Sequence, residues 1–153
     1  MVLLTKIFHF EMAHAIHNYP GACQNIHGHS YELHVTVAAH DQPVDFIPAA
    51  GFIIDFKEIK TLVNATVIRL LDHKLLLSQA FLLQYPSFSQ QEYLVQWGVE
   101  PTAENILLFI KKILTETLSA NIKLSHLKLY ETKDSYAEWT NDDNFKPQTV
   151  GLL

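Results

Sequence analysis

Two stretches of the chain alternate between apolar and polar residues, which is the pattern of a β-strand with one buried face. The first runs from Thr5 to His14 and the second from His27 to Ala39, with Pro20 and Gly21 punctuating the loop between them. Successive side chains of a strand point to opposite faces, so each strand has one apolar face. The apolar face of the first would carry Phe8, Phe10, Met12 and His14, and that of the second His27, His29, Tyr31, Leu33, Val35 and Val37.

Two further stretches place apolar residues at helical spacing. One begins after Asp55, a plausible N-cap, and Glu58 stands where a capping box places its acidic residue. The other begins at Pro101-Thr102. The residues predicted to face the core are Phe56, Ile59, Leu62, Val63, Leu70 and Leu71 in the first helix and Ile106, Leu107, Phe109, Ile110, Ile113 and Leu114 in the second.

Two more strands are predicted at 122–132 and 135–139, joined by a turn around Lys133-Asp134. The order of two strands, two helices and two strands favours an α+β fold, with a four-stranded antiparallel sheet that carries both helices on one face. We expect a single domain over residues 1–153. Residues 76–100 fit this pattern least and are too apolar for a solvated loop, so we expect them to fold over a sheet edge or to meet another subunit.

Charge and composition exclude several classes of function. The formal net charge is −5, Arg69 is the one arginine and the lysines are scattered, which argues against nucleic acid as a partner. No apolar run approaches the roughly 20 residues needed to cross a membrane, so no membrane partner is expected. The first six residues lack the pattern of a secretory signal and one cysteine forms no internal disulfide, so we expect a cytoplasmic protein.

The motif His27-Gly28-His29 places two imidazoles on one face at the start of a strand. If the first two strands pair as a hairpin, His14 reaches the same end of the sheet. Three neutral imidazoles suit zinc and leave a fourth position for water or substrate. The alternative is three unrelated histidines, one in the core and two in a loop.

Three other residues are candidates for chemistry at such a site. Cys23 precedes His27 by four residues and could supply a thiolate base or a fourth zinc ligand. The Asp72-His73 pair could act as an acid–base device, or His73 could simply favour a helix C-terminus. Glu131 could bind two N–H groups of a guanidine-like ring edge, or could be an exposed residue at a strand end.

Together these segments resemble the family of 6-pyruvoyl-tetrahydropterin synthase and of 6-carboxytetrahydropterin synthase from queuosine biosynthesis. They occur in the family's order and extend from about residue 5 to residue 140. The matching segments are Phe10-Glu11-Met12-Ala13-His14, residues 23–31, residues 51–56, Leu71-Asp72-His73, Pro101-Thr102-Ala103-Glu104-Asn105 and Tyr130-Glu131-Thr132.

The resemblance implies a tunnelling fold, in which sheets join around a threefold axis into a barrel and two trimers stack into a homohexamer with active sites at subunit boundaries. It implies 7,8-dihydroneopterin triphosphate as substrate and Zn²⁺ as cofactor. It also assigns roles to the candidate residues. His14, His27 and His29 would bind zinc, Cys23 would move a proton, Asp72 and His73 would form a second relay, and Glu131, with Thr102 nearby, would anchor the pterin ring.

The three residues between Cys23 and His27 resemble the spacing of the bacterial queuosine-type enzyme, whereas a longer spacing is more usual in the animal pyruvoyl-type enzyme. We therefore expect a carbon–carbon lyase that forms 6-carboxy-5,6,7,8-tetrahydropterin with loss of acetaldehyde and triphosphate. The nearest rival is a 6-pyruvoyl-tetrahydropterin synthase, which eliminates triphosphate from the same substrate. A rival of another class is a non-catalytic pterin- or zinc-binding protein of the same fold.

The chain departs from the family pattern in three places. Ala15 stands where the family often has arginine, and Lys74-Leu75-Leu76-Leu77 follows Asp72-His73 in place of the usual Leu-Asn pair. Residues 78–100 are longer than in compact members and are interpreted as an insertion. Because arginine is almost absent, lysines such as Lys74 or Lys133 would have to contact the triphosphate.

Overall fold

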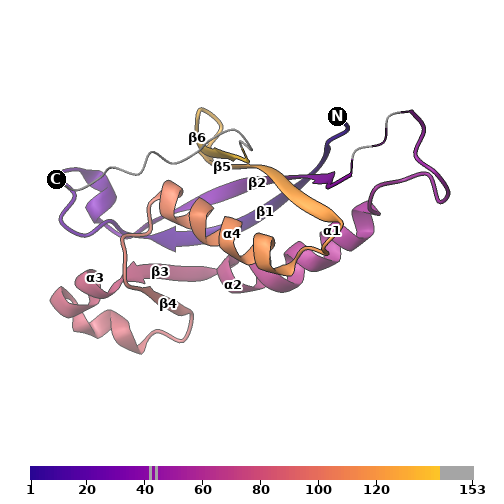
Figure 1. The fold of residues 1–153 in the computed structure, drawn as a ribbon. Helices are drawn as coiled ribbons and strands as arrows, with labels where there is room; N and C mark the ends of the chain where they lie inside the picture. The colour runs from indigo at the N-terminus through magenta and orange to yellow at the C-terminus, as the bar shows by residue number, and fades with distance from the viewer. Residues whose placement is uncertain (42, 44, 142–153) are drawn as a thin grey trace, which may run out of the picture.

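The computed structural model describes residues 1–41, 43 and 45–141, and most of them build one six-stranded sheet and its covering helices. The strand order is β4-β3-β1-β2-β5-β6 (Figure 1). The four strands predicted from the sequence are β1 (Leu4–His14), β2 (His27–Ala39), β5 (Ile122–Thr132) and β6 (Ser135–Thr140), and each pairs with its neighbour in antiparallel fashion. The α+β class and the predicted antiparallel unit are therefore confirmed.

The sheet contains two strands more than predicted, and both are parallel to β1. β3 (Lys74–Ser78) pairs with β1, and β4 (Leu94–Trp97) pairs with β3. Each is a run of at most five residues, too short for its periodicity to distinguish a buried strand from part of a helix. Part of the segment that was expected to fold over a sheet edge instead extends the sheet beyond β1.

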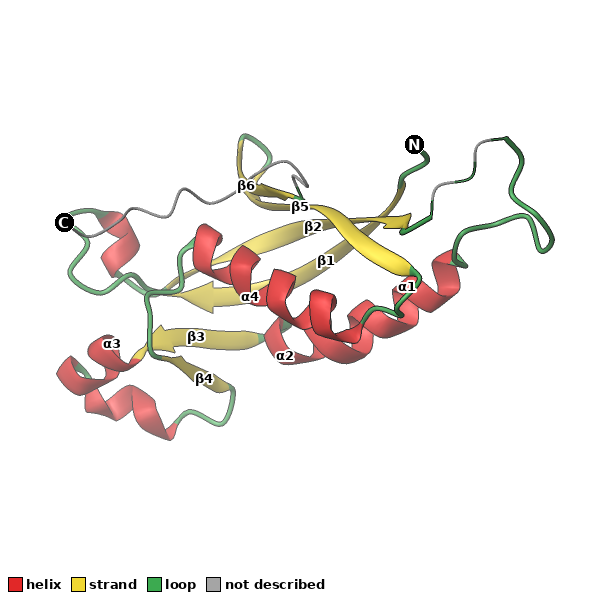
Figure 2. Ribbon diagram, viewed as in Figure 1, coloured by secondary structure: helices red, strands yellow, loops and turns green. Residues whose placement is uncertain are grey.

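The predicted helices both cover the same face of the sheet (Figure 2). The first consists of α1 (Phe56–Val63), a π-helical segment η2 (Asn64–Ile68) and a final turn α2 (Arg69–Leu71), and the second is α4 (Ala103–Thr117). Asp55 is the N-cap of α1, because its carboxylate accepts a hydrogen bond of 2.7 Å from the backbone N–H of Lys57. None of the helices among the described residues is long and apolar enough to cross a membrane.

The π-helical segment changes which residues face the core in the second half of the first helix, after Val63. A wider turn brings residues four apart into line, whereas a regular helix rotates them away by about 40°. Phe56 and Leu70, which were predicted to face inward, are 48% and 41% exposed, so that prediction is wrong. The buried residues of this helix are Ile59, Val63, Val67 and Leu71.

Two apolar clusters hold the elements together, one on each face of the sheet. The larger joins the inner faces of β1, β2 and β5 to α1, η2, α2 and α4, as the alternation predicted. The smaller one lies under α3 (Gln79–Gln84) and the 3-10 helix η3 (Pro86–Gln90), which follow β3. Its buried members are Ala15, Leu75, Leu77, Phe81 and Leu82. Residues 74–97 therefore add two strands and also cover the face of β3 opposite α4.

The fold predicts a contrast between two leucines of α4. Leu114 is fully buried, whereas Leu108 is 52% exposed on the same helix. Leu114→Ala should lower the free energy of unfolding by about 2–5 kcal/mol, because it leaves a cavity in the larger cluster. Leu108→Ala makes the same chemical change without that cavity and should cost less than about 1 kcal/mol. Urea unfolding of both variants measures the difference, and equal losses would contradict the packing described.

Candidate metal centre and active site

The pairing of β1 with β2 brings the three predicted histidines together. His14 is the register partner of His27, and His29 lies two residues further along the same face of β2. The ring centroid of His14 is 4.6 Å from that of His27 and 5.2 Å from that of His29, and the latter two are 5.0 Å apart. One ring nitrogen from each histidine lies within 4.8 Å of the other two, so the group could hold a metal ion.

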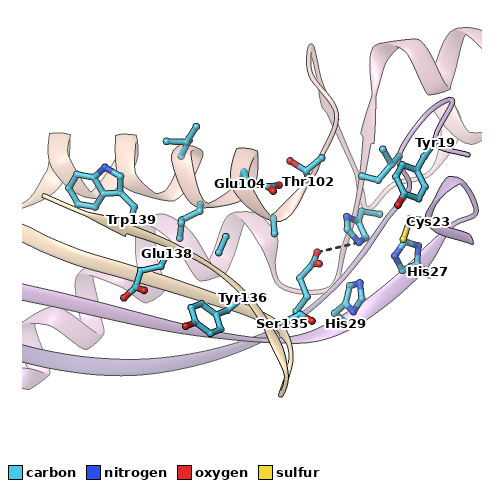
Figure 3. Close-up of a pocket in the computed structure, with 17 residues that line it drawn as sticks. Tyr19, Cys23, His27, His29, Thr102, Glu104, Ser135, Tyr136, Glu138 and Trp139 are labelled. Carbon is cyan, nitrogen blue, oxygen red and sulfur yellow. Dashed lines mark ion pairs between the residues drawn. The ribbon is translucent and has the colours of Figure 1, made fainter. Parts of the chain in front are cut away.

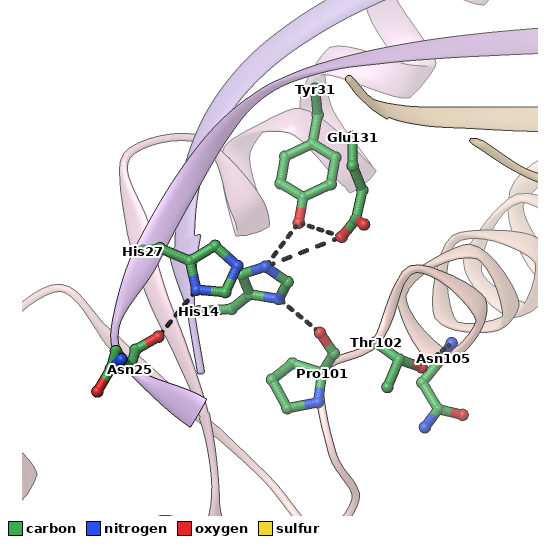
Figure 4. Close-up of polar contacts among 8 residues, drawn as sticks. All are labelled: His14, Asn25, His27, Tyr31, Pro101, Thr102, Asn105 and Glu131. Carbon is green, nitrogen blue, oxygen red and sulfur yellow. Dashed lines mark hydrogen bonds and ion pairs between the residues drawn. The ribbon is translucent and has the colours of Figure 1, made fainter. Parts of the chain in front are cut away.

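Backbone carbonyls orient two of the three rings (Figure 4). His14 Nδ1 donates to the Pro101 carbonyl at 2.7 Å, and His27 Nδ1 donates to the Asn25 carbonyl at 2.8 Å. A hydrogen bond at Nδ1 fixes the tautomer and leaves the Nε2 lone pair free to ligate a metal. Burial lowers the pKa of His14, although the bond to Pro101 opposes this shift, and the lowered pKa favours the neutral imidazole that a metal ligand needs. The residues present therefore fit a bound zinc ion.

Gly28 separates the two histidines of β2 for a reason that sequence analysis did not identify. Its position opposite Ala13 brings it against β1, where an added Cβ would lie 3.1 Å from the Met12 carbonyl oxygen. The close approach that glycine permits is thus made by the neighbouring strand β1. The absent side chain lets the two strands stay paired beside the histidines.

The metal group lies in a cavity of about 640 Å³ that also contains most of the other candidate residues (Figure 3). Cys23, Thr102 and Glu131 all line it, together with side chains of α4 and β6. Cys23 belongs to the 3-10 helix η1 (Ala22–Gln24), is exposed and lies next to His27 in the close-up. Among the described residues the metal group comprises the three histidines without Cys23, which favours a thiol beside the metal over a fourth ligand.

The N-terminus of α4 forms part of the wall of this cavity. Thr102 is the N-cap, and its hydroxyl accepts a hydrogen bond of 3.3 Å from the Asn105 backbone N–H. The preceding residue, Pro101, supplies the carbonyl that orients His14. The segment that begins α4 thus also supplies the carbonyl that orients His14.

Glu131 lies at the end of β5 and is held by a residue that sequence analysis assigned only to the core face. The Tyr31 hydroxyl donates to Glu131 Oε1 at 3.2 Å, and the same oxygen is 3.8 Å from His14 Nε2. Tyr31 is fully buried, and burial, reinforced by Glu131, raises the pKa of its phenol so that the hydroxyl keeps its proton. The sequence signal that could have identified Tyr31 as a site residue was its position two residues after His29, on the same face of β2.

Asp72 and His73 lie outside this cavity within one chain. His73 lines a second cavity of about 560 Å³ with Glu11, Ser30 and other residues, while Asp72 accepts a 2.9 Å hydrogen bond from the Glu11 backbone N–H. His73 Nδ1 is 3.0 Å from Asp72 Oδ1, and the His73 side chain is 78% exposed. Burial alone would raise the pKa of Asp72, but the Glu11 N–H and His73 lower it below its ordinary value.

A model of the 6-pyruvoyl tetrahydropterin synthase family matches residues 3–142. The chain belongs to this family. It is 32% identical to the 6-carboxy-5,6,7,8-tetrahydropterin synthase of Rickettsia typhi, over 90% of this chain and 99% of the relative. It is 30% identical to the protein of the same name from Haemophilus influenzae, over 91% and 99% of the two chains.

Solved structures show that the fold is shared. An uncharacterised protein of Wolinella succinogenes superposes with a TM-score of 0.69 at 17% identity, over 92% of this chain and 98% of the other. The 6-pyruvoyl tetrahydropterin synthase of Caenorhabditis elegans gives a TM-score of 0.64 at 21% identity, over 92% and 96%. The chain fold predicted from the resemblance is thereby confirmed, while the threefold barrel and the homohexamer stay predictions.

The geometry of the three histidines predicts one metal ion per chain. His27→Ala should weaken binding of zinc by at least about 100-fold, because it removes one of three ligands. Cys23→Ala should leave the affinity almost unchanged. Competition with a chromophoric chelator measures both, and cobalt substitution adds a spectroscopic test. A thiolate-to-cobalt charge-transfer band that disappears in Cys23→Ala would show that Cys23 is a ligand and would contradict the three-histidine site.

Proposed function

We propose that the protein is a zinc-dependent lyase that converts 7,8-dihydroneopterin triphosphate to 6-carboxy-5,6,7,8-tetrahydropterin, with release of acetaldehyde and triphosphate. The observation that carries the proposal is the shared cavity, in which a three-imidazole group lies beside a thiol and a carboxylate. Membership of the pterin synthase family and the names of the relatives support the choice of substrate and product.

Each cavity residue has a task in this proposal. The zinc ion supplies Lewis acidity, which makes a side-chain hydroxyl of the substrate easier to deprotonate. Cys23 is exposed in the cavity beside His27 and would carry a proton to and from the substrate side chain. Glu131 would accept two N–H groups from the guanidine-like edge of the pterin, which sets the distance between ring and thiol.

We further propose that Asp72 and His73 act at the cavity of a neighbouring subunit. Within one chain neither residue lines the metal cavity, and His73 lines the second cavity, so we propose that a second copy of the chain brings the pair to the substrate. A cytoplasmic homohexamer built as a dimer of trimers would supply that copy. Lys74 lines the same cavity as His73 and would then be the cation nearest to the triphosphate.

Product analysis tests the reaction. Incubation of the zinc-loaded protein with 7,8-dihydroneopterin triphosphate should yield 6-carboxytetrahydropterin and acetaldehyde in equal amounts, because both come from cleavage of one carbon–carbon bond. Mass spectrometry of the pterin and trapping of the aldehyde measure them. Cys23→Ala should retain zinc and lose most turnover, by about 100-fold or more. 6-Pyruvoyl-tetrahydropterin as the sole product would support the rival synthase, and pterin binding without turnover would support the non-catalytic alternative.

Mixing two inactive variants tests the shared site. Cys23→Ala and His73→Ala should each be inactive alone, because every site lacks one group. When the two are unfolded and refolded together, random assembly should restore about a quarter of wild-type activity, since each site draws its thiol and its imidazole from different chains. A site completed within one chain would remain inactive in every mixture, and this result would refute the proposed sharing.

A further inference from the structure

Tyr31 is fixed between the metal group and the carboxylate of Glu131 (Figure 4). Its hydroxyl is 3.2 Å from Glu131 Oε1 and 3.5 Å from His14 Nε2. Its ring is fully buried and stacks on Phe10, with centroids 5.0 Å apart and planes inclined by 12°. Since packing holds the ring, the hydroxyl is a rigid donor, and it is the only hydrogen-bond donor to the Glu131 side chain among the residues that the structure describes.

Glu131 lies close to the distance at which it would itself bind the metal. Zinc–nitrogen and zinc–oxygen bonds are about 2.1 Å, so two ligands of a tetrahedral ion lie about 3.4 Å apart. Glu131 Oε1 is 3.8 Å from His14 Nε2, only a few tenths of an ångström more. Carboxylate oxygen is a good zinc ligand, and three histidines leave one position open. A cation at this site would therefore attract Glu131 into the position that the substrate needs.

We infer that Tyr31 is a positioning residue that keeps Glu131 from becoming the fourth metal ligand. Its hydroxyl donates to Oε1, the oxygen nearer to the histidines, and holds it 3.8 Å from His14 Nε2, so a shift of the carboxylate into the coordination shell would stretch a part-buried hydrogen bond to a charged acceptor. The carboxylate keeps its remaining lone pairs for other donors. This inference rests on the proposed function only for what Glu131 binds in place of the metal, which is the N–H edge of a pterin.

The inference predicts opposite changes in two affinities. Tyr31→Phe retains the ring and its stacking but frees Glu131, so zinc should bind about tenfold more tightly through the added carboxylate ligand. The zinc-loaded variant should bind pterin about tenfold more weakly, because its anchor is engaged by the metal. A merely structural role for Tyr31 would weaken both affinities together, since loosening the site damages every ligand.

The experiment measures zinc by chelator competition and pterin by fluorescence titration. Pterin itself, without a side chain, is the probe, because it lacks the hydroxyls that would contact the metal. Tyr130→Phe is the matched control, since Tyr130 precedes Glu131 in β5 and its ring contacts His34 and Tyr136. Phenylalanine keeps these ring contacts, so the control should change neither affinity. The gain in zinc affinity should vanish when Tyr31→Phe is combined with Glu131→Gln.

Each possible result decides the question. Tighter zinc and weaker pterin in Tyr31→Phe, with the gain lost in the double variant, support the inference. Unchanged or weaker zinc binding in Tyr31→Phe overturns it, as does a gain that survives Glu131→Gln. If the wild-type protein binds no pterin, the proposed function fails, but the zinc measurements still decide whether Tyr31 restrains Glu131.

Discussion

The candidate site depends on one constraint, the antiparallel register between β1 and β2. His14 faces His27 only in this register, and a slip of one residue would turn the histidines of one strand to the opposite face of the sheet. The slip would also expose every apolar side chain of that strand, because the same alternation buries Phe8, Phe10 and Met12 against the helices. The hydrophobic core thus specifies the position of the metal ligands, although none of the residues that set the register needs to touch the metal.

Periodicity made this part of the molecule predictable from sequence. The period of two identified β1 and β2 and placed the three histidines on one face, and cap residues identified the starts of both long helices. The metal group therefore needed only one further assumption, that the first two strands form a hairpin, and the structure confirms it. Local sequence was sufficient to predict these features, because each can be recognised within a few consecutive residues.

Features that depend on distant partners could not be predicted in this way. β3 and β4 are recognisable only from the strand edge that they complete, since a short apolar run is equally compatible with a helix. The carbonyls of Asn25 and Pro101 orient the metal ligands through backbone atoms, which leave no trace in residue type. Tyr31 occupies a core-facing position of β2, but its hydroxyl also binds Glu131, which lies 100 residues later in the sequence. Strand alternation alone does not reveal that contact.

The fully buried Ala15 limits which residues position 15 can take. It packs in the smaller cluster beneath α3, among leucine and phenylalanine side chains. A guanidinium there would lose its hydration, so an arginine at position 15 would require a different cover over β3. The identity of residue 15 and the packing of α3 therefore constrain each other, and neither can be changed freely without the other.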